Sequence, residues 1–210
     1  MNKPIQHFRF NAADYIVFND DMNIYITNRK GRQRVRPDRK FTISPNNKVS
    51  LVTNGKTKKT WFAVTDTAGL VYLIDTKGKT TTLDVGKYPS SHYFDVVDLD
   101  ANGTSELLIS SGKNILAFSQ KPEKIFQIAT DYPISHHPLF YEFSANNFKI
   151  GIVTGEDNKI YLYNSKGELH KGFPLKGNTQ FSVGLLNNSE NRFNLIVGSN
   201  RNFLYNYSVQ

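Results

Sequence analysis

The sequence predicts an all-β protein made of about five similar four-stranded units, and three observations support this prediction. The 210 residues include eleven Tyr and fifteen Phe, with Gly, Asn, Thr and Ser between the apolar stretches, a mixture that favours strands and turns. No apolar periodicity of helical spacing is long enough to predict a helix. A core of two apolar strands joined by a short polar turn recurs along the whole chain.

The recurring core sets the length of the repeat. Its five copies are Asp14–Gly31, Thr60–Gly78, Glu106–Pro122, Lys149–Gly167 and Asn194–Gln210. The second strand of each copy begins with an apolar residue, and these residues are Ile24, Val71, Ile115, Ile160 and Phe203. They are spaced by 47, 44, 45 and 43 residues. A period of about 45 residues with four strands per unit is typical of the blades of a β-propeller.

Each core is followed by a turn and flanked by further strands. Seven residues after the start of the second strand, four copies have a residue typical of tight turns: Gly31, Gly78, Pro122 and Gly167. The candidates for innermost strands are Ile5–Phe10, Lys48–Thr53, Tyr93–Leu99, Leu139–Phe143 and Phe181–Leu186. The candidates for outermost strands are Gln33–Pro37, Thr80–Val85, Lys124–Ala129 and Leu169–Leu175.

We therefore expect a single propeller domain over residues 1–210, with blades at about 4–40, 41–87, 88–131, 132–177 and 178–210. The last blade lacks an outermost strand, which leaves an unpaired sheet edge of the kind that proteins normally cover. This predicts either the C-terminal part of a larger propeller or an edge covered by another chain, self-association included. A closed five-bladed ring and a β-sandwich with chance periodicity are the alternatives.

Three repeats resemble known propeller families. Ala68–Lys79 resembles the blade repeat of quinoprotein-like propellers, with its Gly, apolar-Tyr pair, Asp and Gly-Lys turn. Asn158–Leu175 is similar to the same repeat and ends in the Gly-Phe-Pro of bacterial integrin-like (FG-GAP type) propellers. Phe94–Ser110 is similar to the calcium-loop repeat of that second group. The resemblance implies the fold but no single activity, because these propellers host unrelated functions.

The resemblance does not extend to the quinone-dependent enzymes. Those dehydrogenases carry tryptophan docking motifs in most blades and an adjacent pair of cysteines. This chain has one tryptophan, Trp61, and no cysteine. We therefore expect no quinone cofactor.

The loop from Asp98 to Glu106 is the sharpest candidate site. Its alternate positions are Asp98, Asp100, Asn102, Thr104 and Glu106, with Gly103 at the sixth position. Oxygen ligands at this spacing, around a glycine that permits a sharp bend, suit Ca²⁺, which would stiffen the blade. The alternative is a turn held by hydrogen bonds from Asx side chains to backbone amides.

Two connecting loops, Tyr88–His92 and Tyr132–His136, share the sequence pattern Tyr-Pro-X-Ser-His. Both loops precede an innermost strand. In a propeller such loops share one face with the turns inside the repeat cores, and partners commonly bind there. This predicts a partner-binding face that includes His92, His136, Asp66 and Asp157. We expect the histidines to tie these loops to neighbouring strands. The alternative is a metal site or a propeller enzyme that uses His92, His136 and His137 at the channel mouth.

The basic residues are concentrated in one segment. Arg29–Lys40 holds seven basic residues and one acid, Asp38, and so contributes +6 of the net charge of +8. A protein-wide basic field for nucleic acid is therefore not expected, and the segment has no aromatic residues on which single-stranded bases would stack. On an outermost strand these charges would deter edge-to-edge pairing. The alternative is contact with an anionic surface, such as membrane lipid, lipopolysaccharide or an acidic partner.

Together these features predict a non-catalytic module that binds or scaffolds a protein or glycan partner. No local motif groups a nucleophile with a base and an acid, so we do not expect an enzyme. No apolar run is long enough to span a bilayer, and the absence of cysteine excludes disulfides. The compartment is open, with an extracytoplasmic location in the periplasm or at the cell surface favoured. A purely structural role as the terminal domain of a larger surface protein is the remaining alternative.

Overall fold

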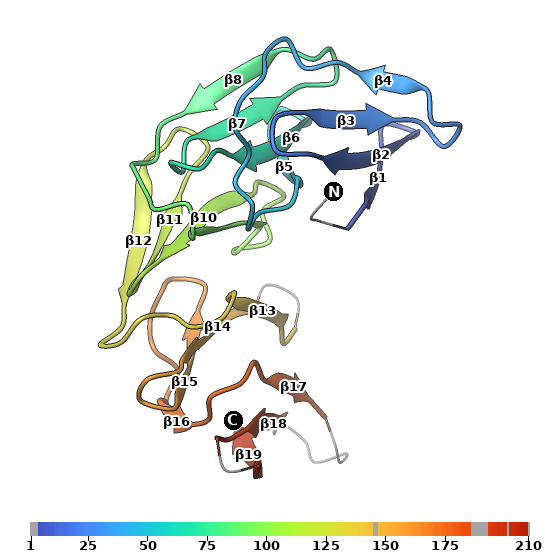
Figure 1. Cartoon of the computed structure of the whole chain (residues 1–210). Helices are drawn as coiled ribbons and strands as arrows, with labels where there is room; N and C mark the ends of the chain where they lie inside the picture. Colours follow the sequence, from blue (N-terminus) through green and yellow to red (C-terminus); the bar gives the residue numbers. More distant parts are fainter. Residues whose placement is uncertain (1–3, 145–146, 186–192, 201, 210) are drawn as a thin grey trace. The chain divides into compact units, whose positions relative to one another are not determined.

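The computed structural model of the chain describes residues 4–144, 147–185, 193–200 and 202–209. Every regular element in these residues is a strand, and the strands form four four-stranded sheets and one three-stranded sheet. In each sheet the strands lie in the order in which they follow one another in the chain (Figure 1). We call these sheets blades 1 to 5 in chain order. The five successive sheets confirm the all-β repeat that the sequence predicts.

Blades 1 and 2 have four strands each. Blade 1 consists of β1 (Gln6–Phe10), β2 (Ala13–Asn19), β3 (Ile24–Thr27) and β4 (Gln33–Val35). Blade 2 consists of β5 (Ser50–Asn54), β6 (Lys59–Thr65), β7 (Val71–Ile74) and β8 (Thr80–Leu83). Neighbouring strands run antiparallel, with Phe8 opposite Tyr15 in blade 1 and Val52 opposite Trp61 in blade 2.

Blades 3 and 4 also have four strands, and blade 5 has three. Blade 3 consists of β9 (Tyr93–Val97), β10 (Glu106–Ser111), β11 (Asn114–Phe118) and β12 (Lys124–Ala129). Blade 4 consists of β13 (Leu139–Glu142), β14 (Phe148–Thr154), β15 (Lys159–Asn164) and β16 (Leu175–Lys176). Blade 5 consists of β17 (Ser182–Gly184), β18 (Phe193–Gly198) and β19 (Leu204–Val209). Among the described residues blade 5 therefore lacks a fourth strand, as the sequence predicts.

The chain forms two compact units. The first comprises Met1–Asp98, Asn102–Ser111 and Ala117–Ile125, and the second comprises Leu99–Ala101, Gly112–Leu116 and Phe126–Gln210. Blades 1 and 2 belong to the first unit and blades 4 and 5 to the second, while blade 3 contributes residues to both. In the part of the chain that the structure describes, no helix has the length and apolar character needed to cross a membrane.

Adjacent blades stack to form the core of each unit. In the first unit Phe62 of β6 is fully buried, and its ring centroid lies 5.3 Å from that of Tyr15 and 5.7 Å from that of Phe10. In the second unit Ile160 of β15 belongs to the same buried cluster as Leu195 of β18. This stacking buries the apolar faces that one small sheet leaves open.

A turn with one recurring set of hydrogen bonds joins the third and fourth strands of blades 1 to 4. Its first residue is Asn28, Asp75, Ser119 or Asn164. A side-chain oxygen of that residue accepts hydrogen bonds from the backbone N–H groups two and four residues later. The residue three positions on has a positive φ and is Gly31, Gly78, Pro122 or Gly167. The turn positions predicted from the sequence are therefore confirmed, and the side-chain acceptor explains the polar residue at the start of each.

Two of these glycines also contact the preceding blade. A Cβ atom on Gly78 would lie 2.0 Å from the carbonyl oxygen of Arg36, and one on Gly167 would lie 2.7 Å from the ring of Phe126. In addition, Asp38 N–H donates a hydrogen bond to Gly78 O at 2.9 Å. Each turn thus lies directly on the outer segment of the blade before it, which leaves no room for a side chain.

The outermost strand predicted at Leu169–Leu175 is wrong in its extent. Leu169 makes an isolated bridge to Tyr163, and the strand itself, β16, pairs only Leu175 and Lys176 with β15. Gly172 has a φ of 91°, and Pro174 has no N–H to donate, so the intervening residues do not continue the ladder.

Candidate functional site

In the first compact unit, hydrogen bonds hold the connections between blades beside the turns inside them. Ile43 N–H donates to Asp21 O, which places the connection from blade 1 to blade 2 against the β2–β3 turn. Tyr88 N–H donates to Ala68 O, which places the next connection against the β6–β7 turn. These contacts confirm that connections and turns share a face within this unit.

The second compact unit repeats the arrangement. Ile134 N–H donates to Gly112 O, and Gly177 N–H donates to Asn158 O. We call these surfaces the turn face of each unit. In the first unit the turn face comprises residues 20–23, 41–47, 66–69 and 88–92. In the second unit it comprises residues 112–114, 132–136, 156–158, 177–180, 199–200 and 202–203.

A buried asparagine connects blades 2 and 3 beneath the turn face. Asn47 Nδ2 donates to Ser44 Oγ and Thr65 Oγ1, both at 3.0 Å, and to the backbone carbonyl of His92 at 3.2 Å. Asn47 Oδ1 accepts a hydrogen bond from Phe94 N–H at 2.8 Å. One side chain thus satisfies polar groups on both blades, where no solvent is available to do so.

His92 completes the same network with both of its ring nitrogens. Nδ1 lies 2.8 Å from Pro89 O, and Nε2 lies 3.0 Å from Thr65 Oγ1. Because a carbonyl oxygen only accepts, Nδ1 carries the proton, and in the neutral ring Nε2 accepts from the Thr65 hydroxyl. The histidine therefore ties its loop to a strand of the preceding blade, which is the role that the sequence favours.

The structure corrects the expectation that the His92 side chain takes part in a contact face. Its exposed fraction is 0%, so the imidazole does not reach a partner. Its Nε2 lone pair is occupied by Thr65, so it is not free to bind a metal either. His136 is half-buried, and its Nδ1 lies 2.9 Å from Ser135 Oγ.

The two aspartates predicted for the partner-binding face lie on the turn face, but their carboxylates are engaged by their own turns. Asp66 Oδ1 accepts from Ala68 N–H and Leu70 N–H. Asp157 Oδ1 accepts from Thr154 Oγ1 at 2.6 Å. Hydrogen bonds of this kind fix the backbone of a turn. Both aspartates therefore shape the turn face.

Asp20 has the same role in blade 1. Its carboxylate accepts hydrogen bonds from Met22 N–H, from the backbone and side chain of Asn23 and from the Tyr25 hydroxyl. These bonds, led by that from Met22 N–H, lower the pKa of Asp20 to about 2. Asp66 accepts from Tyr72 Oη in the same way, at 3.1 Å. A tyrosine on the third strand thus steadies the preceding turn in both blades.

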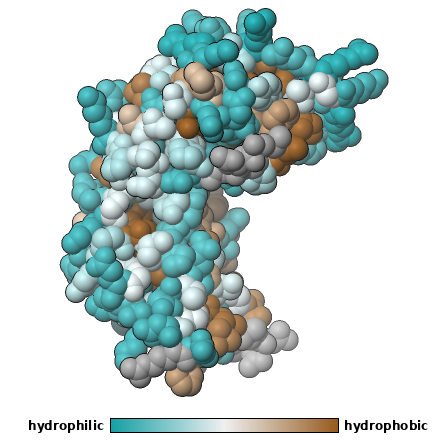
Figure 2. All heavy atoms as spheres, in the orientation of Figure 1, coloured by the Kyte–Doolittle hydropathy of each residue, from teal (hydrophilic) through white to brown (hydrophobic). Residues whose placement is uncertain are grey.

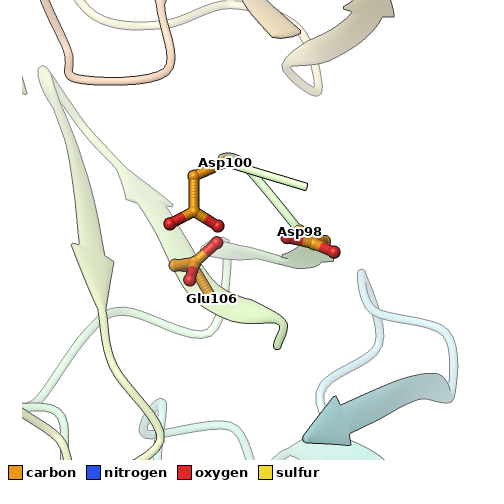
Figure 3. A group of neighbouring side chains, drawn as sticks. All are labelled: Asp98, Asp100 and Glu106. Carbon is orange, nitrogen blue, oxygen red and sulfur yellow. The ribbon is translucent and has the colours of Figure 1, made fainter. Parts of the chain in front are cut away.

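The structure brings together three of the five residues predicted for a calcium site. Asp98, Asp100 and Glu106 each offer a carboxylate oxygen within 4.8 Å of those of the other two. Figure 3 shows the carboxylates of Asp100 and Glu106 facing each other. Among the described residues this is the one group of three or more possible metal-ligating side chains, so no histidine there belongs to such a group. Carboxylate oxygens in this arrangement suit a hard cation.

The loop of residues 98–106 is also held by the Asx hydrogen bonds of the alternative interpretation. Asp98 accepts from Asn102 N–H at 3.0 Å and from Gly103 N–H at 2.7 Å. Thr104 Oγ1 accepts from Gly55 N–H at 3.2 Å, which fastens the loop to blade 2. Each carboxylate oxygen has a second lone pair, so these bonds leave room for a cation.

The basic segment of residues 29–40 falls on the β3–β4 turn, on β4 and on the residues after it. Arg29 forms an ion pair with Asp14 at 3.0 Å, and the Arg34 guanidinium lies 5.3 Å from the ring centroid of Tyr15. Most side chains of the segment are exposed, as expected for a solvated outer edge. Its last residues, however, line a cavity.

Sequence reasoning missed Asn47. It lies in a polar connection and resembles any other turn asparagine in a single sequence. The available signal was its separation of 45 residues from His92, which is the length of the repeat. Residues at matching positions of adjacent blades are candidates for contacts between them.

The comparisons with known proteins find similar folds only. No known protein family matches the chain, and no curated protein matches it. The structure of BBS1N in complex with ARL6DN, soaked with mercury, matches with a TM-score of 0.58 at 12% identity and covers 98% of this chain and 64% of that chain. The same complex soaked with lead matches with a TM-score of 0.57 at 13% identity, over 97% and 65%. A protein of unknown function from Bacteroides caccae has a TM-score of 0.46 at 14% identity, over 94% and 73%.

The chain thus spans a little under two thirds of the length of BBS1N chains that it matches. At this level of identity the likeness shows the fold alone. Together with the five successive sheets, it shows that the chain is a β-propeller of about five blades.

Proposed function

We propose that the chain is a non-catalytic propeller module that binds a protein partner through the turn faces of its two units. The observation that carries this proposal is the presence of exposed apolar side chains on turns whose backbones are fixed by hydrogen bonds. Met22 lies on the turn face of the first unit with an exposed fraction of 54%, and Tyr132 and Phe203 lie on that of the second unit with exposed fractions of 40% and 62%. Exposed apolar side chains on a preorganised backbone are typical of interfaces, because little entropy is lost on binding.

The polar residues of the turn face support binding over catalysis. Asp66 and Asp157 are engaged in hydrogen bonds within their own turns, and His92 is engaged in one with Thr65 of the preceding blade. A hydrolytic site needs a nucleophile and a base that remain available to the substrate. These residues instead hold the loops in place.

Two further observations support a protein as the partner. BBS1N is described in complex with ARL6DN, so a propeller of similar fold holds a protein. On the face shown in Figure 2, apolar side chains form small separate groups among hydrophilic ones. Such groups suit a protein interface, where a few anchor residues carry most of the binding energy.

Site-specific photocrosslinking tests the proposal. The photoreactive residue p-benzoylphenylalanine replaces Met22, Tyr132 or Phe203 in turn, and Ile125 in the control. Ile125 is a matched control because it is equally apolar, is 52% exposed and lies on the outer strand β12. We expect the turn-face positions to crosslink one and the same protein, identified by mass spectrometry, in cells of the native organism. Equal capture at Ile125, or no capture at the turn face, contradicts the proposal.

We also propose that Ca²⁺ binds the loop of residues 98–106 and stiffens it. The gathering of the Asp98, Asp100 and Glu106 carboxylates supports this proposal. The loop is fastened to blade 2 through Thr104, so a bound cation there would strengthen a contact between two blades. This role is structural and separate from the turn face.

A further inference from the structure

A cavity of about 440 Å³ lies beside the turn face in blade 1. One wall is formed by the β2–β3 turn and the start of β3, including Met22 and Tyr25. The end of the basic segment, including Arg36, Arg39 and Lys40, forms another part of the lining, which we call the basic wall. Apolar and cationic side chains therefore meet in one concave site.

Of the described acidic groups near this cavity, only Asp38 forms an ion pair with one of its cations. The Asp20 carboxylate is engaged by Met22 N–H, Asn23 and the Tyr25 hydroxyl. Asp38 accepts a hydrogen bond from Thr80 N–H and lies 3.8 Å from Arg39 Nε.

The other two cations of the cavity are available. Among the described residues no carboxylate lies within 4.0 Å of Arg36 or Lys40. Both side chains belong to exposed residues. The cavity thus presents unpaired positive charge next to the exposed, apolar side chain of Met22.

We infer that this cavity binds an acidic peptide segment of the protein partner, with one apolar or aromatic residue inserted between Met22 and the basic wall. The inference rests on the proposed function and narrows its partner class. The inference is supported by charge complementarity, because guanidinium groups bind carboxylates through paired hydrogen bonds. An apolar side chain that fills a cavity typically contributes much of the binding energy of an interface.

The shape of the site favours a peptide over a membrane. An anionic bilayer is recognised by basic side chains spread over a broad surface, and the affinity then depends on their number. Here three of the cations converge with apolar side chains in a cavity large enough for a few residues of a peptide. The remaining cations of the segment, such as Lys30 and Arg32, do not line it.

Fluorescence anisotropy with a labelled peptide tests the inference on the whole chain. The probe is the peptide Glu-Glu-Phe-Glu-Glu, and its neutral counterpart is Gln-Gln-Phe-Gln-Gln. The variant Arg36→Gln/Lys40→Gln removes two charges from the cavity. The variant Lys30→Gln/Arg32→Gln removes two charges from the same segment outside it. Thermal melting of both variants checks that they fold.

We expect the cavity variant to weaken binding of the acidic peptide at least tenfold, or about 1.4 kcal/mol, and the control variant to weaken it less than about threefold. We expect Met22→Ser by itself also to weaken binding of the acidic peptide. The same variant should leave unchanged the binding of an acidic peptide that has Ser in place of Phe. Equal losses in both double variants would show a general positive field and overturn the inference.

A vesicle-binding experiment distinguishes a peptide ligand from an anionic membrane. Vesicles of phosphatidylcholine with phosphatidylserine are compared with vesicles of phosphatidylcholine alone. Vesicle binding that depends on Arg36 and Lys40, without peptide binding, overturns the inference in favour of lipid. If the acidic peptide does not bind while photocrosslinking at Tyr132 and Phe203 still captures a partner, the inference about the cavity is wrong and the proposed function stands. If neither peptide binding nor crosslinking is observed, both the inference and the proposed function are wrong.

Discussion

Asn47 donates a hydrogen bond from its side-chain amide to the backbone carbonyl of His92, at 3.2 Å and across 45 residues of sequence. Because this separation equals the repeat length, the two residues occupy matching positions at the starts of blades 2 and 3. Asn47, just before the first strand of blade 2, is thus hydrogen-bonded to His92, just before the first strand of blade 3. Such contacts between matching positions are how a repeat array fixes the orientation of its neighbours.

Replacement of Asn47 tests this contact. Asn47→Ala leaves the N–H of the buried Phe94 without its acceptor, and we expect the free energy of unfolding to fall by about 1–3 kcal/mol. The measurement is urea denaturation. Asn46→Ala is the matched control, because the Asn46 side chain makes only a 3.4 Å surface contact with Ser90 O. Similar losses in the two variants would show that the network does not stabilise the fold.

The interface between blades 4 and 5 depends on a glycine without a side chain. A Cβ atom on Gly151 would lie 2.7 Å from Phe181 Cζ and 2.8 Å from Tyr141 Cε2. We expect Gly151→Ala to destabilise the protein by about 1–3 kcal/mol, because the two rings have to move.

The control for Gly151 is Gly184→Ala, at a position with nothing within 4 Å of the added atom. We expect Gly184→Ala to leave stability almost unchanged in the same denaturation experiment. A neutral Gly151→Ala variant would show that the packing of Tyr141 and Phe181 is looser than described.

The Asp20 carboxylate gives the blade 1 turn a defined dependence on pH. Its pKa is about 2 in the folded chain, against an ordinary value of 3.8, so the charged form is favoured by folding. The stabilisation is therefore present above about pH 4 and is lost as the pH falls from about 4 to about 2. An NMR titration of the Asp20 carboxyl carbon checks the midpoint.

Substitution of Asp20 tests the same pH dependence through the thermal stability of the chain. We expect Asp20→Asn to reduce the loss of thermal stability between about pH 4 and pH 2. Asp21→Asn removes the same charge without affecting the amides of residues 22 and 23. A midpoint near 3.8 for Asp20, or identical acid profiles for the two variants, would contradict the hydrogen-bonding scheme.

Calcium is expected to raise the melting temperature through the loop of residues 98–106. A ligand at 100 times its dissociation constant adds about 2.7 kcal/mol to the stability of the folded chain. We expect addition of Ca²⁺ to stabilise the chain, and chelation to reverse the effect. Asp100→Asn should abolish the response, whereas Glu123→Gln, on an exposed turn, should leave it intact. No response in the unmodified chain, or the same response in both variants, would rule out the loop as the site.

Much of the fold is predictable from the sequence because each repeat carries its own local signals. In four of the five repeats, the glycine or proline seven residues after the start of the second core strand marks the turn between the third and fourth strands. The apolar runs of β14 and β15 mark strands that are covered on both faces. The outermost strand of blade 4 was misplaced because Gly172 and Pro174 interrupt pairing, while Leu169 alone maintains a bridge.

The candidate site was less predictable because it depends on contacts between repeats. His92 looks like a surface histidine in sequence, and only its contact with Thr65 of the preceding blade shows that it is buried. Arg36 and Lys40 look like part of a uniform basic run until the fold places them in the lining of one cavity with Met22. Such contacts join residues from different strands, which no local pattern encodes.

Hydrogen–deuterium exchange of the chain with its purified crosslinked partner shows which surface the partner covers. We expect the partner to protect backbone amides on the turn face of each unit, including residues 20–23 and 132–136. We expect unchanged exchange along the outer strands β8 and β12. Protection of those outer strands with no change at the turns would contradict the proposed function.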